Sequence, residues 1–492
     1  MQSRDDPRAE PAASDACVLC GGTRRTYLAG GRFRITRCND CQLVLRTDEG
    51  RLSVEPASFE LDDDSDHTVR AMLAAGATRR RKVLAVVDGG STHARLRDDP
   101  RLDVTVVAAD ALSSVGRETF DAAFVNGSIE STNPLGVMRA VRNAVRPGAD
   151  VVVVVAASTI RQPRIPPYSF SAAPLTRLTL AADLHPRSCG IISRSIDTTI
   201  RDERLAVSAI PFERVARLFE AVGKRVEVPS GLLAMHARAE PLPARRKLSI
   251  IMPVFNEAKT FLDMFEQVYA AHVGDVDREI VLVESNSTDG SRELVQKVAD
   301  RPDVIAIYEE RPLGKGHAVR AGIEASTGEF ILIQDADSEY DVGDYDIVLG
   351  PLLDLSATFV LGSRHLGGGT WKIREFANQR VLSYVMNLAH ESFTALTNGL
   401  YSTEMRDPTT MYKVFRRDAY EGIRFTRDRF DFDWELVCKL VRRGHMPVEV
   451  PVNYRSRSYA EGKKVRLFRD PLTWLETIVA SRFEALGEDT TP

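Results

Sequence analysis

The sequence predicts an α/β protein, because apolar strands alternate with helical patterns through most of its 492 residues. One series reads KVLAVV, LDVTVV, FDAAFV and ADVVVVV, and a second reads KLSIIMPV, REIVLVE and FILIQ. Alternation of this kind is typical of parallel sheets, whose ligands lie at the carboxyl ends of the strands. Two CxxC pairs precede both series. We therefore expect about three folded units in this length of chain.

Changes in composition mark the expected boundaries. Residues 1–15 are polar and read as a disordered tail, and residues 16–50 contain the CxxC pairs. An acidic stretch at 60–67 is expected to be a solvated loop before a sheet domain at 68–240. The segment AEPLPARRK, with two prolines and three basic residues, then leads into a last domain at 247–485.

Overall composition excludes some classes of function. The hydrophobic content of 43% is ordinary for buried cores, and the net charge of −4 gives no electrostatic support for nucleic acid binding. The N-terminus lacks the apolar segment of a signal peptide, and the chain lacks a run of about 18 apolar residues that could span a bilayer. We expect a cytoplasmic protein that could still contact the inner membrane face peripherally.

The N-terminal cysteines predict a structural zinc site. Cys17 and Cys20 form one CxxC pair, Cys38 and Cys41 form another, and seventeen residues lie between the pairs. The intervening RFRITR reads as a strand. Four thiolates at this spacing are typical of a closed, tetrahedral Zn²⁺ site in a zinc ribbon. The two remaining cysteines are interpreted as buried or incidental thiols, Cys189 and Cys438.

An acidic pair follows the apolar strand FILIQ. Asp335 and Asp337 are one residue apart, so on an extended chain their side chains point to the same side and can converge on one divalent cation. Glu339 lies two residues further and could be a third ligand. Mg²⁺ or Mn²⁺ held by carboxylates is suited to a diphosphate, since it neutralises negative charge directly. An isolated pair of this kind also occurs in solvated loops, so the neighbouring motifs decide whether this pair is a metal site.

Those surroundings are a set of motifs in a fixed order: PVFNE, VESNSTDGS, LGKGHAVRAG, DADSEYDVGDY, LGSR, RDPTTMYKVFRR and VPVNYRSRSYAEGKKV. In this order they resemble the family 2 inverting glycosyltransferases, in the dolichol-phosphate mannose synthase-like branch, from residue 247 to about 485. The resemblance implies a GT-A nucleotide-diphospho-sugar transferase domain. It also implies a metal-dependent transfer of one sugar from a nucleoside diphosphate to an acceptor.

On the donor side, the resemblance implies that the base and ribose contact Pro253, Phe255 and Glu257. Glu284 stands where the family has an aspartate. The metal ligands implied are Asp335 and Asp337, with Glu339. Lys315 lies between Gly314 and Gly316, whose missing side chains would let the backbone approach a ligand closely. An ordinary exposed turn lysine remains an equal reading.

On the acceptor side, two chemistries stay open. A polyprenyl phosphate is already anionic and needs only positive groups, whereas a soluble hydroxyl acceptor needs a base. The resemblance places basic groups at or near the acceptor phosphate, namely Arg364, Arg380, Arg457, Lys463 and Lys464. It places Asp433 and Glu435 where a base would stand. We favour the polyprenyl phosphate and assign catalytic roles to Asp337, Arg364, Asp433, Glu435, Arg457 and Lys463.

The middle domain resembles the class I methyltransferases, because RPGADVVVVV matches their late strand. Their GxGxG loop is replaced here by VVDGGSTHARL, with Val87 and Asp88 where a glycine is expected. We therefore expect a scaffold that does not bind S-adenosylmethionine. A methyltransferase active beside the transferase is the alternative, with His93 and His185 as its candidate residues. A non-catalytic binding protein is a third reading, which the intact DAD and EGKK segments oppose.

Overall fold

The structure is a computed structural model, and the part of the chain that it describes comprises residues 16–17, 19, 22–23, 25–29, 33–38, 43–48, 51–52, 63–74, 77–87, 94–127, 129, 133–156, 168–195, 227–240, 245–366, 380–401, 403–455, 470–484 and 486. The chain forms two compact units, Met1–Cys189 with Gly231–Leu242, and Gly190–Ser230 with Pro243–Pro492. The finer boundaries at residues 50 and 68 stay predictions.

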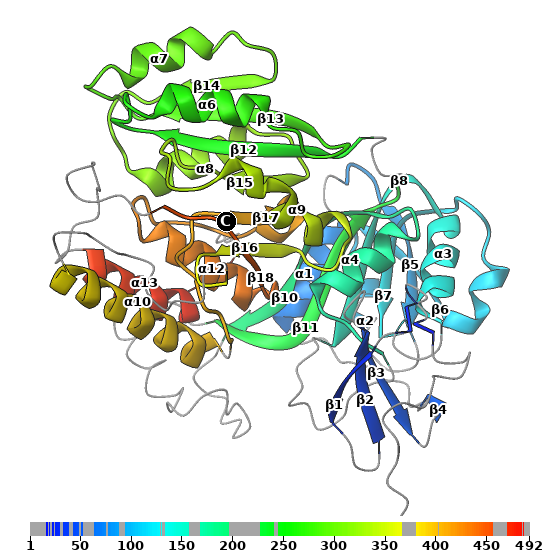
Figure 1. The fold of residues 1–492 in the computed structure, drawn as a ribbon. Coiled ribbons are helices and arrows are strands. Elements are labelled where there is room, and N and C mark those ends of the chain that lie inside the picture. Colours follow the sequence, from blue (N-terminus) through cyan, green and yellow to red (C-terminus); the bar gives the residue numbers. More distant parts are fainter. Residues whose placement is uncertain are drawn as a thin grey trace, which may run out of the picture. The chain divides into compact units, whose positions relative to one another are not determined.

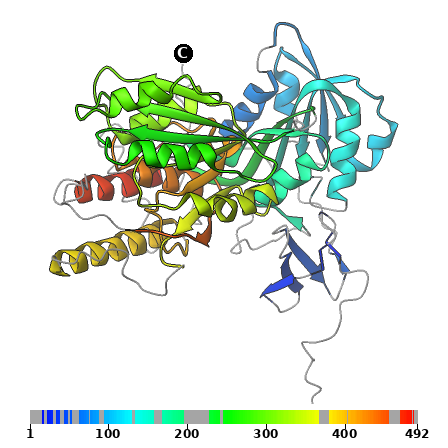
Figure 2. The same cartoon turned by 45° about the horizontal axis from the view of Figure 1, so that its top comes forward.

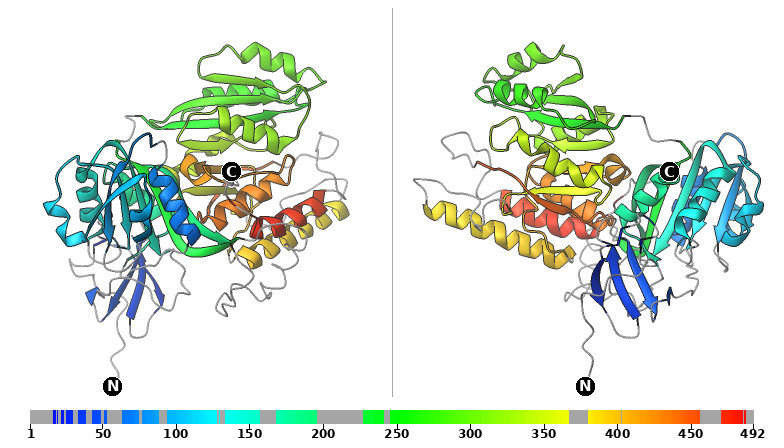
Figure 3. Two further views of the ribbon diagram at one scale, coloured as in Figure 1. Left: turned by 180° about the vertical axis from the view of Figure 1, so that it is seen from behind. Right: turned by 45° about the vertical axis from the view of Figure 1, so that its right-hand side comes forward.

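A small antiparallel sheet contains Cys38 of the second CxxC pair, and Figure 3 shows its first strands in dark blue. The strand expected at RFRITR is confirmed as β2. The first four strands pair in the order β1-β2-β3-β4, and β9 pairs with β3. The strands are β1 (Arg25–Ala29), β2 (Phe33–Cys38), β3 (Val44–Asp48), β4 (Arg51–Leu52) and β9 (Tyr168–Ser169).

The first unit also contains a six-stranded sheet in the order β10-β11-β8-β7-β5-β6. Its parallel strands are β5 (Arg81–Val87), β6 (Leu102–Val107), β7 (Phe120–Asn126) and β8 (Val145–Ala156), as the apolar runs predict. Residues 83–87 and 151–155 are buried throughout, as in a sheet covered on both faces. The other two strands are β10 (His185–Ser195) and β11 (Glu227–Arg238), and β11 runs antiparallel to β8.

The helices of this unit include one that the sequence did not predict. The acidic stretch at 60–67 was expected to be a loop, but helix α1 (Asp63–Ala74) begins inside it. That expectation is wrong for residues 63–67, because carboxylates in a first turn stabilise a helix by interacting with its dipole. Among the described residues, the other helices include α2 (Ala94–Asp98), the 3₁₀ helix η2 (Ala109–Ser114), α3 (Pro134–Ala144) and α4 (Ala172–Leu180).

The second unit is built on a seven-stranded sheet in the order β14-β13-β12-β15-β17-β16-β18 (Figure 1). Its first four strands are parallel, and β17 runs antiparallel between β15 and β16. The strands are β12 (Lys247–Val254), β13 (Asp277–Glu284), β14 (Val304–Tyr308), β15 (Phe330–Ile333), β16 (Phe359–Ser363), β17 (Lys413–Arg416) and β18 (Val448–Pro451). Sequence reasoning missed β14, although its run VIAIY was a visible strand signal.

Alternate residues of these strands pack into two separate cores. Ile250 and Leu282 belong to one core, and Ile251 and Val283 belong to the other. The first core packs against α6 (Phe261–Ala270), α7 (Ser291–Val298) and α9 (Tyr345–Leu353). The second packs against α8 (Lys315–Ala325) and α12 (Phe432–Arg442), with residues of α10 (Arg380–Tyr401) and α13 (Asp470–Phe483). The short elements are η4 (Val342–Asp344) and α11 (Arg417–Tyr420).

Candidate active site at the carboxyl ends of the parallel strands

Two loops at neighbouring strand ends are bonded to each other. Asn256, just after β12, has a positive φ of 51° and accepts the backbone N–H of Thr288 at 2.9 Å. The backbone N–H of Glu257 donates to Ser291 Oγ at 2.8 Å. These bonds fix the PVFNE loop, and with it Pro253 and Phe255, against the loop that follows β13. The predicted donor residues thus share one edge of the sheet.

Glu284 is held by its own loop. Its buried carboxylate accepts the backbone N–H groups of Ser287 at 2.6 Å and Asn286 at 3.2 Å, and the Arg292 guanidinium at 2.9 Å. Arg292 also lies over the Tyr308 ring at 5.2 Å. Glu284 therefore shapes this loop, whatever further contact it makes. Arg292 was missed by sequence reasoning, because the strand that carries Tyr308 was missed.

The acidic pair lies just beyond the end of β15. Asp335 Oδ1 is 2.5 Å from the ammonium of Lys315, and Asp337 is buried and accepts the backbone N–H of Glu339 at 3.1 Å. Glu339 in turn accepts the Tyr454 hydroxyl at 3.1 Å. Within the described residues, these three carboxylates do not form a three-ligand group within 4.8 Å. Binding of a metal ion by them stays a prediction.

Lys315 is not an exposed turn lysine, since only 13% of its side chain is accessible. Burial disfavours its charge, but the nearby carboxylates of Asp335, Asp433 and Asp337 outweigh burial and raise the pKa of Lys315. The lysine therefore keeps its charge at the edge where the acidic pair lies.

The space beside Gly314 and Gly316, the glycines that flank Lys315, is occupied by other parts of the protein. A side chain on Gly316 would meet Phe432 Cβ at 2.5 Å and the carbonyl oxygen of Arg427 at 2.6 Å. Gly314 has a φ of +119°, and a side chain there would clash with the backbone of Asp428. The expectation that a ligand approaches the backbone closely at these two glycines is therefore wrong, because residues 427–429 already fill that space.

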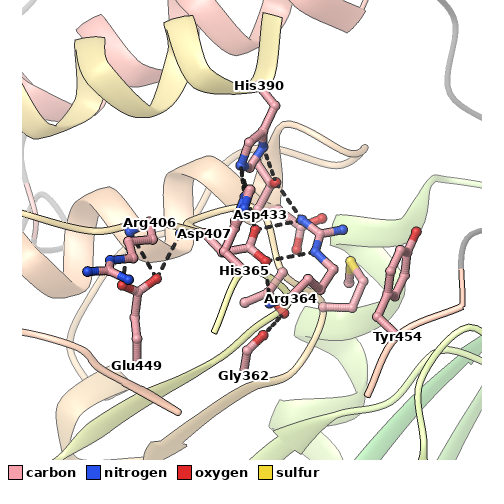
Figure 4. Close-up of polar contacts among 12 residues, drawn as sticks. Gly362, Arg364, His365, His390, Arg406, Asp407, Asp433, Glu449 and Tyr454 are labelled. Atoms are coloured by element: carbon pink, nitrogen blue, oxygen red, sulfur yellow. Dashed lines mark hydrogen bonds and ion pairs between the residues drawn. The ribbon is translucent and has the colours of Figure 1, made fainter. Parts of the chain in front are cut away.

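Arg364 follows β16 and forms a buried ion pair with Asp407 (Figure 4). Its Nε and Nη2 atoms donate to the two carboxylate oxygens at 2.7 and 2.6 Å, and its backbone N–H donates at 2.9 Å. Burial opposes the charge of Asp407, but Arg364 overcomes it and holds the pKa of Asp407 well below its usual range. Glu449 accepts the backbone N–H of Asp407 at 2.7 Å, which fixes the loop.

The two candidate bases differ in their surroundings. Asp433 accepts the fully buried ammonium of Lys413 at 3.1 Å. Glu435 has no accessible surface and accepts the Thr426 and Arg427 backbone N–H groups and the Lys439 ammonium. A carboxylate enclosed by so many donors is poorly placed to take a proton from an acceptor. We therefore assign Glu435 to holding the loop at 426–427, and only Asp433 remains a candidate base.

Several predicted residues lie outside the described part of the chain, namely Cys20, Cys41, Asp88, His93, Arg457, Lys463 and Lys464. Arg380 is the first residue of α10, and the structure does not describe its side chain. His185 lies 3.9 Å from Glu240.

The two remaining cysteines are both buried, as expected. Cys189 is buried, and burial raises the pKa of the buried Cys438 thiol to about 12. Cys438 therefore stays protonated.

Cys17 and Cys38 occupy equivalent turns. Both are buried, and their backbone N–H groups donate at 2.9 Å to the carbonyl oxygens of Gly22 and Leu43, each five residues further on. Both turns thus close in the same way around the first cysteine of a CxxC pair. Zinc binding by the four cysteines stays a prediction.

Acidic, lysine and arginine side chains therefore gather at the carboxyl edge of this largely parallel sheet. Residues 249–424 match the family model described as glycosyl transferase family 2. The C-terminal region is therefore a family 2 glycosyltransferase domain, and the protein is a glycosyltransferase.

The chain is similar to several proteins over this same region. Glycosyltransferase AglJ of Haloferax volcanii is 24% identical over 230 residues, which are 46% of this chain and 70% of AglJ. Dolichyl-phosphate beta-glucosyltransferase ALG5A of Trichomonas vaginalis is 26% identical, over 46% of this chain and 70% of its own. Dolichol-phosphate mannosyltransferase of Pyrococcus furiosus is 22% identical, over 44% of this chain and 59% of its own length. Among solved structures, glucosyl-3-phosphoglycerate synthase from Mycobacterium tuberculosis is 18% identical, with a TM-score of 0.36, over 48% of this chain and 80% of its own.

Across the residues that the structure describes, no helix has both the length and the apolar character needed to cross a membrane.

Proposed function

We propose that this glycosyltransferase moves a sugar from a nucleoside diphosphate to a polyprenyl phosphate, with inversion at the anomeric carbon. The observation that carries the proposal is the grouping of Asp335, Asp337 and Lys315 at one sheet edge, close enough for both carboxylates to raise the pKa of the lysine. A donor diphosphate needs this combination, since carboxylates hold a divalent ion and an ammonium binds a phosphate oxygen.

Mg²⁺ or Mn²⁺ fits the donors present. Asp335 and Asp337 offer the oxygen ligands that hard cations prefer, and a positive group already lies against Asp335. The ion would be held by these two residues, with Glu339 as a further candidate. When bound, it would neutralise charge that grows on the leaving diphosphate.

The acceptor chemistry follows from the positive groups nearby. An oxygen of the acceptor phosphate attacks the anomeric carbon, the bond from that carbon to the diphosphate oxygen breaks, and the diphosphate leaves with the electron pair. In-line attack inverts the configuration. An anionic nucleophile needs no base, but it needs cations to position it, and Arg364 is fixed for that role by Asp407. Arg457, Lys463 and Lys464 are proposed to join it.

Two neighbouring helices support a lipid acceptor. Tyr384 and Leu388 on α10 are 54% and 51% exposed, and Leu472 and Leu475 on α13 are 70% and 44% exposed. Each pair is three or four residues apart and so shares a helix face. The helices contact each other, and they lie side by side in yellow and red in Figure 2. These apolar groups suit peripheral contact with a bilayer or with the acceptor tail. Two of the relatives are named for transfer to dolichyl or dolichol phosphate.

For the N-terminal half, we propose a zinc ribbon at 16–50 and a methyltransferase-like scaffold at 68–240. The buried first cysteines of both CxxC pairs support the ribbon. The parallel order β6-β5-β7-β8 supports the scaffold, and Val87 at the end of β5 opposes S-adenosylmethionine binding, because its side chain stands where that cofactor requires glycine.

The decisive experiment measures nucleotide release from UDP-, GDP- and dTDP-sugars with Mn²⁺, with and without a short polyprenyl phosphate. We expect one donor to be consumed only when the lipid phosphate is present, and Asp337→Asn to abolish that turnover. Release that needs Asp337 but is unaffected by the lipid would replace the lipid acceptor by a soluble hydroxyl compound. Absence of release from every donor would overturn the proposal.

A further inference from the structure

Two histidines and an aspartate converge beside Arg364 (Figure 4). The Nε2 atoms of His365 and His390 are 3.2 Å apart, and His390 Nε2 is 3.9 Å from Asp407 Oδ1. One ligand atom from each residue lies within 4.8 Å of the other two. We propose that His365, His390 and Asp407 bind a first-row transition-metal ion of the Zn²⁺ type.

The facing imidazole nitrogens need either a hydrogen or a metal ion between them. An unprotonated imidazole nitrogen carries a lone pair, so two of them at 3.2 Å repel each other unless a proton or a metal ion lies between. The distance suits a metal ion. A tetrahedral ion about 2.0–2.1 Å from each nitrogen separates two nitrogens by about 3.3 Å. The histidine pair thus already has the spacing of two ligands, and Asp407 Oδ1, which lies 3.9 Å from His390 Nε2, has to approach that atom by about half an ångström.

A second layer of contacts orients the ligands. The Nδ1 atom of His390 is 3.1 Å from Thr409 Oγ1, which also accepts Arg364 Nη2 at 3.0 Å. A hydroxyl oxygen can accept from both, so that Nδ1 carries the hydrogen and Nε2 keeps the lone pair that a metal ion needs. Asp407 Oδ1 accepts Arg364 Nη2 at 2.6 Å, and a carboxylate oxygen can bind a metal ion while it accepts a hydrogen bond.

Ligand chemistry separates this site from the proposed donor site. Imidazole nitrogen suits Zn²⁺, Co²⁺ or Fe²⁺, whereas Asp335 and Asp337 offer only oxygen and suit Mg²⁺ or Mn²⁺. Three protein ligands leave at least one position for water or an anionic oxygen. The Arg364 guanidinium opposes a second positive charge, so the ion binds less tightly here than at four thiolates. The inference does not depend on the donor or acceptor proposed above.

The test is metal binding by the full chain after chelator treatment. Zn²⁺ content at equilibrium and the visible absorption of bound Co²⁺ are compared for the wild-type protein and His365→Gln, a change at a half-buried side chain. We expect His365→Gln to bind one fewer Zn²⁺ and to lose the visible Co²⁺ bands typical of nitrogen and oxygen ligands. The near-ultraviolet thiolate-to-Co²⁺ band, which reports on the predicted cysteine site, should persist.

Two matched variants complete the design. His272→Gln removes an exposed histidine, and Asp337→Asn removes a carboxylate of the donor site. Both should keep the Zn²⁺ that His365→Gln loses. His390→Gln serves as an independent second variant, with thermal melting to confirm that it folds. Equal Zn²⁺ content and equal Co²⁺ spectra in the wild-type protein and both folded histidine variants would overturn the inference and leave a shared proton between the rings.

Discussion

Asp407 fixes both the side chain and the backbone of Arg364, since it accepts Nε, Nη2 and the main-chain N–H of that one residue. The carboxylate is fully buried, and Glu449 holds the loop that carries it through the backbone N–H groups of Arg406 and Asp407. The position of the Arg364 guanidinium is therefore set by residues that need not touch any substrate.

Removing one partner of this pair should be costly. We expect Arg364→Ala to lower the free energy of unfolding by about 3–5 kcal/mol, because it leaves a buried carboxylate without its counter-charge. Urea denaturation of Arg301→Ala provides a matched control, since Arg301 forms a comparable two-contact pair with Glu266 at the surface. Equal destabilisation by both changes would contradict the special role of burial at Arg364.

The acidic pair should control turnover without controlling stability. Asp337→Asn keeps the size of the side chain and removes the charge, so we expect nucleotide release to fall about 100-fold or more. Asp346→Asn, an exposed position on α9, should leave the rate within about twofold. The rates are measured at saturating Mn²⁺, and a rate for Asp337→Asn near that of the control would remove Asp337 from the site.

Asp433 and Glu435 should respond differently to the same change. Glu435→Gln disrupts a fully buried carboxylate that holds three backbone or lysine donors, so its main effect should be a lower melting temperature. Asp433→Asn leaves the buried Lys413 ammonium without its counter-charge, so it should also lower the melting temperature. Unlike Glu435→Gln, however, it should lower turnover in the protein that remains folded, because it alters the charge near Lys315. The reverse pattern would restore Glu435 as the functional residue.

Two helical glycines give opposite predictions for the same substitution. Gly399→Ala on α10 meets nothing within 4 Å and should stabilise the protein by roughly 0.5–1 kcal/mol. Gly316→Ala on α8 forces a methyl group against Phe432 and Arg427, and overpacking of this kind costs about 1–3 kcal/mol. Chemical denaturation compares the two. Stabilisation by Gly316→Ala would mean that the loop at 427–429 moves aside.

Glu279 should make stability depend on acid pH. Burial alone would raise its pKa, but hydrogen bonds from Lys247, Ser249 and Thr327 outweigh burial and lower the pKa to about 2. The stabilisation is therefore complete above the unfolded pKa of about 4.3 and is lost as pH falls toward 2. The stability gap between the wild-type protein and Glu279→Gln should narrow over that interval in urea titrations. Glu310→Gln, an exposed carboxylate, controls for net charge, and a constant gap would refute the prediction.

The strand ends were predictable because apolar runs and polar loops are local features of the sequence. The pairing of Arg364 with Asp407 was not, since 43 residues separate them and the contact depends on the antiparallel pairing of β16 with β17. The meeting of His365 with His390 likewise depends on the path of α10. The structural role of Glu435 could have been predicted, because Lys439 lies four residues further on the same helix and such pairs interact.

The contact between Lys315 and Asp335 bears on the order in which substrates enter. On the proposed reaction, a bare divalent ion has to displace an ammonium from Asp335, and mutual repulsion then opposes its retention. A nucleotide diphosphate that arrives with its ion supplies negative charge for both positive groups at once. On this proposal the resting enzyme would be biased against filling with cations alone, and donor and ion would load as a single complex.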